Sequence, residues 1–384
     1  MSSQKVITIT SLIEKVGRRL HMATLAKWTA YRIQQLLMPP RKWAIDIEKA
    51  EEILNKLHKD LHNSAVWELP RPQQYKWDLE VIIPVYNAED YIQKCIDSVL
   101  NQETQYSFHI ILVNDSSTDR SAEIIQTYKD NAKITILHQK NSGVSVARNN
   151  GLRHTEAKYV TFIDSDDMMA PGAIEAYMKE AYANDADIVE GSYRRISPEG
   201  KFFAGEKRVY NNDAQRKDMA GFVCMKAIRT SLFEHICFPA SYWHQDTITA
   251  MLLVPASEKR ILISNDVYYY TYNTNSMSFS PKAKPKRLET LYVTRAILEG
   301  AKKLGLISKD PQYAYHNYLK QVRMNRFRTE SLGLDVEWAV FCIHCDLLKK
   351  YFENITCTEP NLKDIEIALK TTNISLYRRA CLMY

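Results

Sequence analysis

The sequence predicts an α/β fold, in which a mostly parallel sheet carries helices on both faces and is flanked by helical N- and C-terminal extensions. Two observations predict this fold. From Leu79 onward, short β-rich runs alternate with helical stretches, an order typical of parallel strands joined by crossover helices. The chain has 384 residues, of which 45% are hydrophobic, so it can bury a large core.

The segment before the sheet, residues 1–76, has a helical pattern. Apolar side chains recur there at helical spacing, namely Ile47, Ala50, Leu54, Leu57 and Leu61. Pro70 and Pro72 then indicate a linker. Glu14 is the only acid in the first 45 residues, against eight Lys or Arg. This basic segment is expected either to lie on an anionic membrane surface or to pack on the sheet domain or on another subunit of a homo-oligomer.

Five strands and four helices are expected within the sheet domain. The strands are predicted at residues 79–85, 108–114, 133–138, 158–164 and 186–191. The helices begin near Glu89, Asp119, Val144 and Pro171. After about residue 280 the helical pattern returns and continues to the end. We therefore predict a helical extension at 1–76, a sheet domain at 77–280 and a helical region at 281–384.

Composition excludes several classes of protein. The net charge of +6 is a mild excess, and nucleic acid is not an expected partner. Seven cysteines without a secretory pattern favour a cytoplasmic setting. No apolar run approaches the roughly 18 residues of a membrane span, so any membrane contact is expected to be peripheral, at the inner face. Cys342 and Cys345 form a lone pair on a helical pattern, which favours core packing over a four-ligand zinc site.

Polar clusters follow three of the predicted strands. They are Pro84-Val85-Tyr86-Asn87, the run 114–119, and Asp164-Ser165-Asp166-Asp167. Parallel sheets bind ligands at the carboxyl ends of their strands. One cluster alone could merely cap a helix, but three at one edge predict a site. Acids this close repel each other unless a cation lies between them, and Mg²⁺ or Mn²⁺ binds carboxylates together with substrate phosphates.

Four motifs in this order carry a resemblance to a known family: VIIPVYN, VNDSSTD, NSGVSVARNNGL and FIDSDD. Over about residues 78–280 the chain resembles a family 2 glycosyltransferase, an inverting enzyme of the Rossmann-like GT-A fold, of the type that assembles bacterial polysaccharides. The resemblance implies contacts to the nucleotide from Pro84, Val85, Tyr86, Asn87, Asp115, Gly143, Arg148, Asp164 and Ser165. Among these, Arg148 is expected near the diphosphate and Asp164 near the ribose.

The resemblance also implies a metal ligand and a catalytic base. Asp166 would hold Mn²⁺ or Mg²⁺. The role of the adjacent Asp167 stays open between a substrate contact, support of the metal ligand from behind and a cap for the helix at Pro171. Asp246, after Phe238-Pro239, matches the family's base, although it could simply cap the following helix through Leu253. Gln245 stands where the family usually has Glu. Further substrate contacts are expected from Trp243, His244, Gln245, Tyr272, Asn275, Ser276 and Ser278, and sugar-facing side chains among residues 190–195 and 223–228.

The implied reaction is a single displacement that inverts the anomeric carbon. The donor would be a nucleoside-diphosphate sugar, with UDP as the favoured nucleotide. The acceptor would be a saccharide or lipid-linked saccharide in cell-surface or exopolysaccharide synthesis. Two alternatives are a sugar-nucleotide nucleotidyltransferase and an inactive relative that binds saccharide or partner proteins. The former needs a Gly-rich phosphate loop after the first strand, which PVYNAEDY does not provide.

Overall fold

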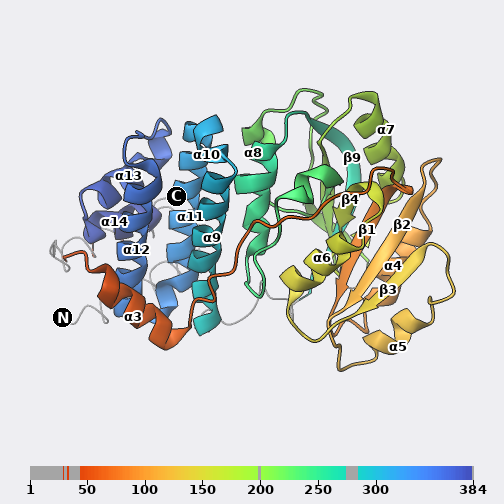
Figure 1. The fold of residues 1–384 in the computed structure, drawn as a ribbon, viewed down its shortest axis with the longest axis horizontal. Coiled ribbons are helices and arrows are strands. Elements are labelled where there is room, and N and C mark those ends of the chain that lie inside the picture. Colours follow the sequence, from red (N-terminus) through yellow and green to blue (C-terminus); the bar gives the residue numbers. More distant parts are fainter. Residues whose placement is uncertain (1–28, 30–32, 34–43, 198–199, 274–283, 383–384) are drawn as a thin grey trace. The chain divides into compact units, whose positions relative to one another are not determined.

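A computed structural model describes residues 29, 33, 44–197, 200–273 and 284–382 of the protein (Figure 1). The chain divides into two compact units. One contains His62–Ser280 and Ala296–Lys309, and the other contains Met1–Leu61, Pro281–Arg295 and Asp310–Tyr384. The domain boundaries expected at residues 76 and 280 stay predictions. No helix within the described ranges is both long and apolar enough to cross a membrane.

A nine-stranded sheet forms the centre of the first unit, in the order β3-β2-β1-β4-β8-β6-β9-β5, with β7 paired to β6. The strands are β1 (Trp77–Val85), β2 (Phe108–Asn114), β3 (Ile134–His138), β4 (Ala157–Phe162), β5 (Met168–Met169), β6 (Ile188–Ile196), β7 (Phe202–Glu206), β8 (Lys226–Arg229) and β9 (Arg260–Thr271). β1 to β4 pair in parallel. Beyond β4 the pairing is mixed, because β8 is antiparallel to both β4 and β6 whereas β6 and β9 are parallel.

Helices join the parallel strands, as the alternating sequence pattern predicts. They are α4 (Ile92–Leu100), α5 (Ser121–Gln126), α6 (Val144–Arg153) and α7 (Ala173–Ala183). Every residue of β2 is buried, as expected for a strand covered on both faces. α6 packs closely on the sheet through Gly151, where an added Cβ would lie 2.6 Å from Cγ2 of Ile82. The predicted α/β fold class is confirmed.

The fourth strand ends earlier than the sequence predicts. β4 stops at Phe162, although Ile163 still donates its backbone N–H to the carbonyl of Ile82 at 3.2 Å. The chain then turns, because the N–H of Asp167 bonds the carbonyl of Asp164 at 2.9 Å. The prediction of a strand through Asp164 was therefore wrong by two residues. The acids lie on a turn, which gives each carboxylate a different environment.

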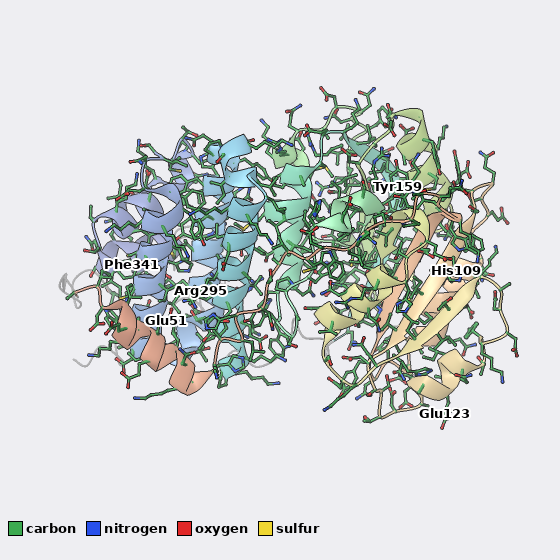
Figure 2. All side chains as sticks on the ribbon, viewed as in Figure 1. Glu51, His109, Glu123, Tyr159, Arg295 and Phe341 are labelled. Carbon is green, nitrogen blue, oxygen red and sulfur yellow. The ribbon has the colours of Figure 1, made fainter. Side chains whose placement is uncertain are left out.

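The second unit is helical. It includes α3 (Ile47–Leu57), part of α9 (Glu289–Lys303), α11 (Pro311–Thr329), α12 (Leu334–Phe352), α13 (Lys363–Lys370) and α14 (Ile374–Leu382), while α8 (Val254–Ala256) and α10 (Leu306–Lys309) belong to the sheet-containing unit. α3 packs on α12. Arg295 bonds Glu51 at 2.6 Å and Asp60 at 2.9 Å, which ties α9 to the segment around α3 (Figure 2). Cys342 is buried on α12, in keeping with core packing.

Candidate active site

The polar clusters of the first and second strands meet at one edge of the sheet. The register places Val85 of β1 beside Asn114 of β2. β4 runs parallel to β1, with Phe162 beside Ile82, so the acids that follow β4 reach the same edge. Carboxyl ends of parallel strands are where loops open to admit a ligand. The structure therefore brings the predicted polar clusters together, and their role as a binding site stays a prediction.

The loops after β1 and β2 are joined to each other. Pro84 and Val85 end β1 and are buried, whereas Tyr86 is 48% exposed. Asn87 has a left-handed backbone, with φ of 49°, a conformation that Asn adopts more readily than most residues. Its side-chain oxygen accepts the N–H of Thr118 at 2.8 Å. This contact leaves Tyr86 presented at the rim between the two loops.

Asp115 is buried and fastens the loop before α6. Its carboxylate accepts hydrogen bonds from the N–H groups of Ser142 at 2.8 Å and Gly143 at 2.7 Å, and from Nε2 of Gln139 at 2.8 Å. Gly143 has φ of 89° and directly precedes α6. Asp115 therefore shapes the entrance to α6, whatever contact it makes with a nucleotide. Sequence reasoning assigned no role to Gln139, which lies outside the motifs, or to Ser142, which lies within NSGVSVARNNGL.

The three acids after β4 differ in their partners. Asp167 is 2% exposed and accepts the hydroxyl of Tyr268 at 2.5 Å and the N–H of Thr271 at 2.7 Å. Asp166 is half-buried and accepts Nδ2 of Asn273 at 3.0 Å. Ser165 between the acids is also half-buried. Asp167 thus anchors the turn to β9, and Asp166 remains the acid that could hold a cation.

The pKa values of these acids reflect their crowding. Burial, followed by the charge of Asp164, raises the pKa of Asp166. Burial and the charges of Asp166 and Asp164 raise the pKa of Asp167 well above its usual value. A bound cation would relieve this repulsion. Among the described residues, no three His, Cys, Asp or Glu side chains form a cage for a metal, so any ion held by Asp166 would take much of its shell from a substrate.

Arg148, on α6, connects the acids to the candidate base. Its guanidinium is 1% exposed. Nη2 donates to Oδ1 of Asp164 at 2.6 Å, whereas Nη1 donates to Oδ1 of Asp246 at 2.6 Å and to Oε1 of Gln245 at 2.9 Å. Burial alone would lower the pKa of Arg148, but the carboxylates of Asp246 and Asp164 outweigh it and raise that pKa. Its terminal nitrogens thus contact Asp164, Gln245 and Asp246, and the contact of Arg148 with a diphosphate stays a prediction.

Asp246 lies in a short 3-10 helix, Gln245–Thr247. Its side chain is 35% exposed. Oδ1 bonds Arg148, and Oδ2 makes no hydrogen bond with any residue in the described part of the chain. Burial raises the pKa of Asp246, Arg148 opposes that rise, and the net direction is upward. The second oxygen of an acid held in this way could accept a proton from a substrate hydroxyl.

The residues just before Asp246 shape its loop. His244 has a left-handed backbone, with φ of 62°, which is uncommon outside glycine and is frequent at functional sites. Trp243 and His244 are both half-buried. Gln245 is 4% exposed. It helps to orient the guanidinium of Arg148, because its amide oxygen accepts a hydrogen bond from Nη1. The family's usual Glu at this position would place a third carboxylate on the same guanidinium.

Several functional residues escaped sequence reasoning. Asn273 bonds Asp166, and Tyr268 bonds Asp167. Cys224 is 6% exposed, and its sulfur lies 4.0 Å from Oδ2 of Asp164. The Tyr-rich run 268–272 was the feature of the sequence that could have indicated Tyr268 and Asn273 as residues of the site. Tyr272 is 40% exposed, whereas Asn275, Ser276, Ser278 and the basic residues of the N-terminus lie outside the described residues.

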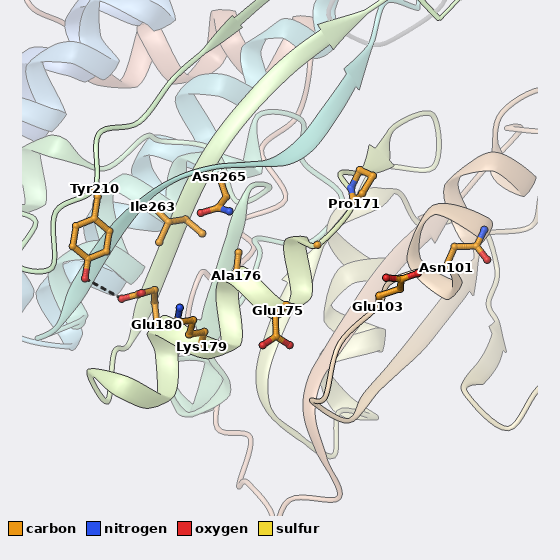
Figure 3. A pocket seen from close by; sticks show the side chains of 11 residues that line it. Asn101, Glu103, Pro171, Glu175, Ala176, Lys179, Glu180, Tyr210, Ile263 and Asn265 are labelled. Atoms are coloured by element: carbon orange, nitrogen blue, oxygen red, sulfur yellow. Dashed lines mark hydrogen bonds between the residues drawn. The ribbon is translucent and has the colours of Figure 1, made fainter.

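A hollow of about 600 Å³ lies elsewhere in the same unit, against α7 (Figure 3). Its lining includes the acids Glu103, Glu175 and Glu180 but a single cation, Lys179. Glu180 also accepts the hydroxyl of Tyr210 at 3.1 Å. None of the residues predicted to contact the nucleotide lines this hollow. The rim of the acids and Arg148 is therefore the better candidate for a nucleotide site.

Comparison with known proteins agrees with this geometry. Residues 80–242 match the family model of glycosyl transferase family 2. Glycosyltransferase GlyA of Streptococcus pneumoniae is 33% identical over 218 residues, covering 52% of this chain and 31% of GlyA. The uncharacterized glycosyltransferase EpsJ of Bacillus subtilis is 30% identical over 219 residues, covering 53% of this chain and 63% of EpsJ. The chain thus spans less than two thirds of these relatives.

A third relative and a solved structure extend the comparison. The minor teichoic acid biosynthesis protein GgaB of B. subtilis is 26% identical over 277 residues, covering 69% of this chain and 30% of GgaB. S. aureus TarS 1–349, solved in complex with UDP-GlcNAc, superimposes with a TM-score of 0.63 at 19% identity, covering 79% of this chain and 90% of that one. Residues 80–242 are thus similar to glycosyl transferase family 2, and the chain has the GT-A fold.

Proposed function

We propose that this chain is a metal-dependent, inverting glycosyltransferase that moves a sugar from a UDP-sugar to a hydroxyl of a saccharide or lipid-linked saccharide. One observation carries the proposal. Arg148 bonds both Asp164, on the acid turn after β4, and Asp246, the candidate base, at 2.6 Å each. A donor held at the acid turn and an acceptor held at the base would therefore meet at one centre.

Asp246 would act as the general base. A hydroxyl is a weak nucleophile at neutral pH, so the reaction needs a carboxylate that takes its proton as it attacks the anomeric carbon. The N–H groups of Arg148 fix Oδ1 of Asp246, which leaves Oδ2 for the acceptor hydroxyl. Attack from the face opposite the leaving diphosphate would invert the anomeric carbon. The C–O bond to the diphosphate breaks as the new glycosidic bond forms.

Asp166 would hold Mn²⁺ or Mg²⁺. When bound, such an ion offsets the charge that develops on the leaving nucleoside diphosphate. Asn273 orients the carboxylate of Asp166 by donating to Oδ2 at 3.0 Å. Asp167 keeps the acid turn fixed to β9 through Tyr268 and Thr271. These contacts set the position of Asp166 before any substrate arrives, and preorganisation of this kind favours catalysis.

The comparisons support the choice of donor and setting. S. aureus TarS, which has the same fold, was solved in complex with UDP-GlcNAc and with UDP. GgaB is named for minor teichoic acid biosynthesis, which supports a role in assembling a cell-surface polymer. We place the protein in the cytoplasm, where the donor would be supplied. Contact of its basic N-terminal segment with the inner membrane surface remains a prediction.

A panel of sugar nucleotides tests the proposal. The intact protein is incubated with each nucleotide sugar and Mn²⁺, and release of the nucleoside diphosphate is followed with and without EDTA. We expect release from at least one donor, loss of release with EDTA, and a fall of about 10²–10⁴-fold in Asp246→Asn, the range typical of general base catalysis. Asp166→Ala should abolish the release that Mn²⁺ supports in the wild-type protein.

Controls separate this reaction from the alternatives. Release of pyrophosphate from a nucleoside triphosphate and a sugar phosphate would indicate a nucleotidyltransferase. Activity that survived both Asp166→Ala and Asp246→Asn would refute the mechanism. If UDP with Mn²⁺ raised the melting temperature but no donor in the panel was turned over, the chain would be a binding protein and the proposed activity would be wrong.

A further inference from the structure

An aromatic and basic surface lies where β6, β7 and β9 run together. It consists of Arg195, Phe203, Tyr270 and Tyr272, which we call the Phe203 face. Phe203 is 53% exposed and Tyr272 is 40% exposed, and their rings lie edge to face with centroids 6.1 Å apart. Arg195 pairs with Tyr270 in the sheet, with its guanidinium 5.7 Å from the ring centroid. Exposed aromatic rings gathered in this way often mark a binding surface.

The Phe203 face extends directly from the candidate active site. Side chains two residues apart on a strand share a face, so Tyr268, Tyr270 and Tyr272 lie on one side of the segment. The hydroxyl of Tyr268 bonds Asp167. The residue after Tyr272 is Asn273, whose amide bonds Asp166. Since consecutive Cα atoms are about 3.8 Å apart, Tyr272 lies at the edge of the acid turn.

The surrounding charge is positive. Residues 193–208 contain five Lys or Arg against two Glu. Arg208 is paired with Glu190 and Glu206, and Arg194 lies 4.0 Å from Asp266. Arg195, Lys201 and Lys207 are exposed, and none of the three forms an ion pair with a residue that the structure describes. Among the described residues, the charged side chains that remain available around the Phe203 face are therefore cationic, in contrast with the acidic hollow beside α7.

We propose that the Phe203 face binds an anionic saccharide chain, and that this chain is the acceptor of the proposed reaction. Aromatic rings present large apolar surfaces at low entropic cost, which suits the C–H face of a sugar ring. Arg and Lys pair with carboxylate or phosphate groups. A chain lying on Phe203 and Tyr272 would bring its end toward the acid turn and Asp246. This inference rests on the proposed function and names the chemistry of its acceptor.

Affinity electrophoresis of the intact protein tests the inference. Native gels contain unmodified dextran, carboxymethyl dextran or dextran phosphate, so that only the anionic group differs. We expect both anionic gels, or one of them, to retard the protein and neutral dextran to leave it unretarded. Added salt should weaken the retardation, because exposed charges are screened. Retardation by neutral dextran equal to that by the anionic polymers, or retardation by none of the three, would overturn the inference.

Matched variants locate the binding surface. Phe203→Ala should weaken retardation by about tenfold in apparent Kd, a loss typical of a well-packed aromatic contact, whereas Phe327→Ala, at 47% exposure in the other unit, should not. Lys201→Gln should weaken retardation by about threefold, as expected for one partly screened charge, and Lys129→Gln, another exposed lysine, should not. Equal effects within either pair would overturn the assignment to this face.

A parallel measurement separates this inference from the proposed function. The melting temperature of the wild-type protein is recorded with UDP and Mn²⁺, and ligand binding to the folded state should raise it. If UDP has no effect and no donor is turned over, the proposed function fails, whatever the gels show. If the donor assay succeeds while the anionic gels do not retard the protein, the Phe203 face is refuted and the proposed function stands.

Discussion

Two buried clusters, one in each unit, pair arginine with carboxylate in opposite proportions. In the sheet-containing unit, Arg148 serves two acids, Asp164 and Asp246, whose side chains are 40% and 35% exposed. In the helical unit, Glu337 on α12 serves two arginines, Arg326 at 3.1 Å and Arg378 at 2.8 Å, and its side chain is 8% exposed. In the first cluster one arginine is shared by two acids that reach solvent. In the second, one closed-off acid is shared by two arginines, and Glu330 also lies 4.0 Å from Arg326.

The pKa values of the two clusters follow this difference. Burial would raise the pKa of Glu337, but Arg326 and Arg378 outweigh it and hold the pKa below its usual value. Burial raises the pKa of Asp246, and one shared arginine does not reverse the rise. The helical cluster therefore keeps its charge and suits a structural role. The cluster around Arg148 contains an acid whose pKa is raised, and a raised pKa makes its carboxylate a stronger base.

The largest expected effect on stability comes from opening the closed cluster. Glu337→Gln would remove the buried carboxylate that Arg326 and Arg378 share. Removing one partner of a buried pair costs about 3–5 kcal/mol of unfolding free energy, which urea denaturation would measure. Donor turnover at a temperature where the variant is folded should be unchanged. A loss of turnover without a loss of stability would contradict the structural role given to this cluster.

Opening the Arg148 cluster should affect turnover more than stability. Arg148→Met leaves Asp164 and Asp246 without their shared donor, and we expect kcat/KM to fall about 10³-fold, which corresponds to about 4 kcal/mol. Arg148→Lys keeps the charge but loses the fork that reaches both acids, so it should restore part of kcat. Variants equal in kcat to the wild-type protein would show that Arg148 does not position the base.

The pH profile of turnover should report the raised pKa of Asp246. The base works as a carboxylate, so kcat/KM should fall as the pH drops through that pKa, at a pH above the ordinary value of 3.8. Because Arg148 lowers the pKa of Asp246, Arg148→Lys should move the acid limb upward. An acid limb at or below the ordinary value would remove Asp246 from the role of base.

The stability of the fold should also fall at low pH, through Glu337. A carboxylate whose pKa is depressed in the folded state stabilises the fold above its unfolded pKa and loses that contribution as the pH falls through the folded one. The unfolding free energy of the wild-type protein should therefore decline below about pH 4.5. Glu337→Gln should lessen the decline over that window, and an unchanged slope in the variant would mean that other acids dominate.

The smallest expected effect comes from restoring the family's residue beside the base. Gln245→Glu would place another carboxylate against Nη1 of Arg148, which now bonds Gln245 at 2.9 Å and Asp246 at 2.6 Å. Competition for one donor should raise the pKa of Asp246 and lower kcat/KM at neutral pH by about threefold, equivalent to under 1 kcal/mol. Steady-state rates should also be measured for Gln245→Asn, which shortens the side chain without adding charge. Comparison of the two variants would separate the effect of charge from the effect of side-chain length.

Much of the fold could be predicted because its signals are local. The β-rich run at 79–85 became β1, Trp77–Val85, and the helix expected near Val144 begins there as α6. The second half of the sheet was less predictable. β8 is only four residues long and pairs antiparallel between β4 and β6, an arrangement set by the packing of distant segments. The turn after Phe162 also depends on a long-range contact, since Tyr268 bonds Asp167.

The sequence by itself determined that three acids would stand at the rim of a parallel sheet, because strand ends and polar clusters are read from neighbouring residues. Only the tertiary structure decided which partners each acid has. Arg148 bonds Asp246 across 98 positions of the chain, and Asn273 reaches Asp166 across 107. Charge and burial at such contacts determine the pKa of each acid and which carboxylate oxygen makes no hydrogen bond within the protein. The spacing of residues along the chain does not predict these contacts, because the fold brings the residues together only when the sheet has formed.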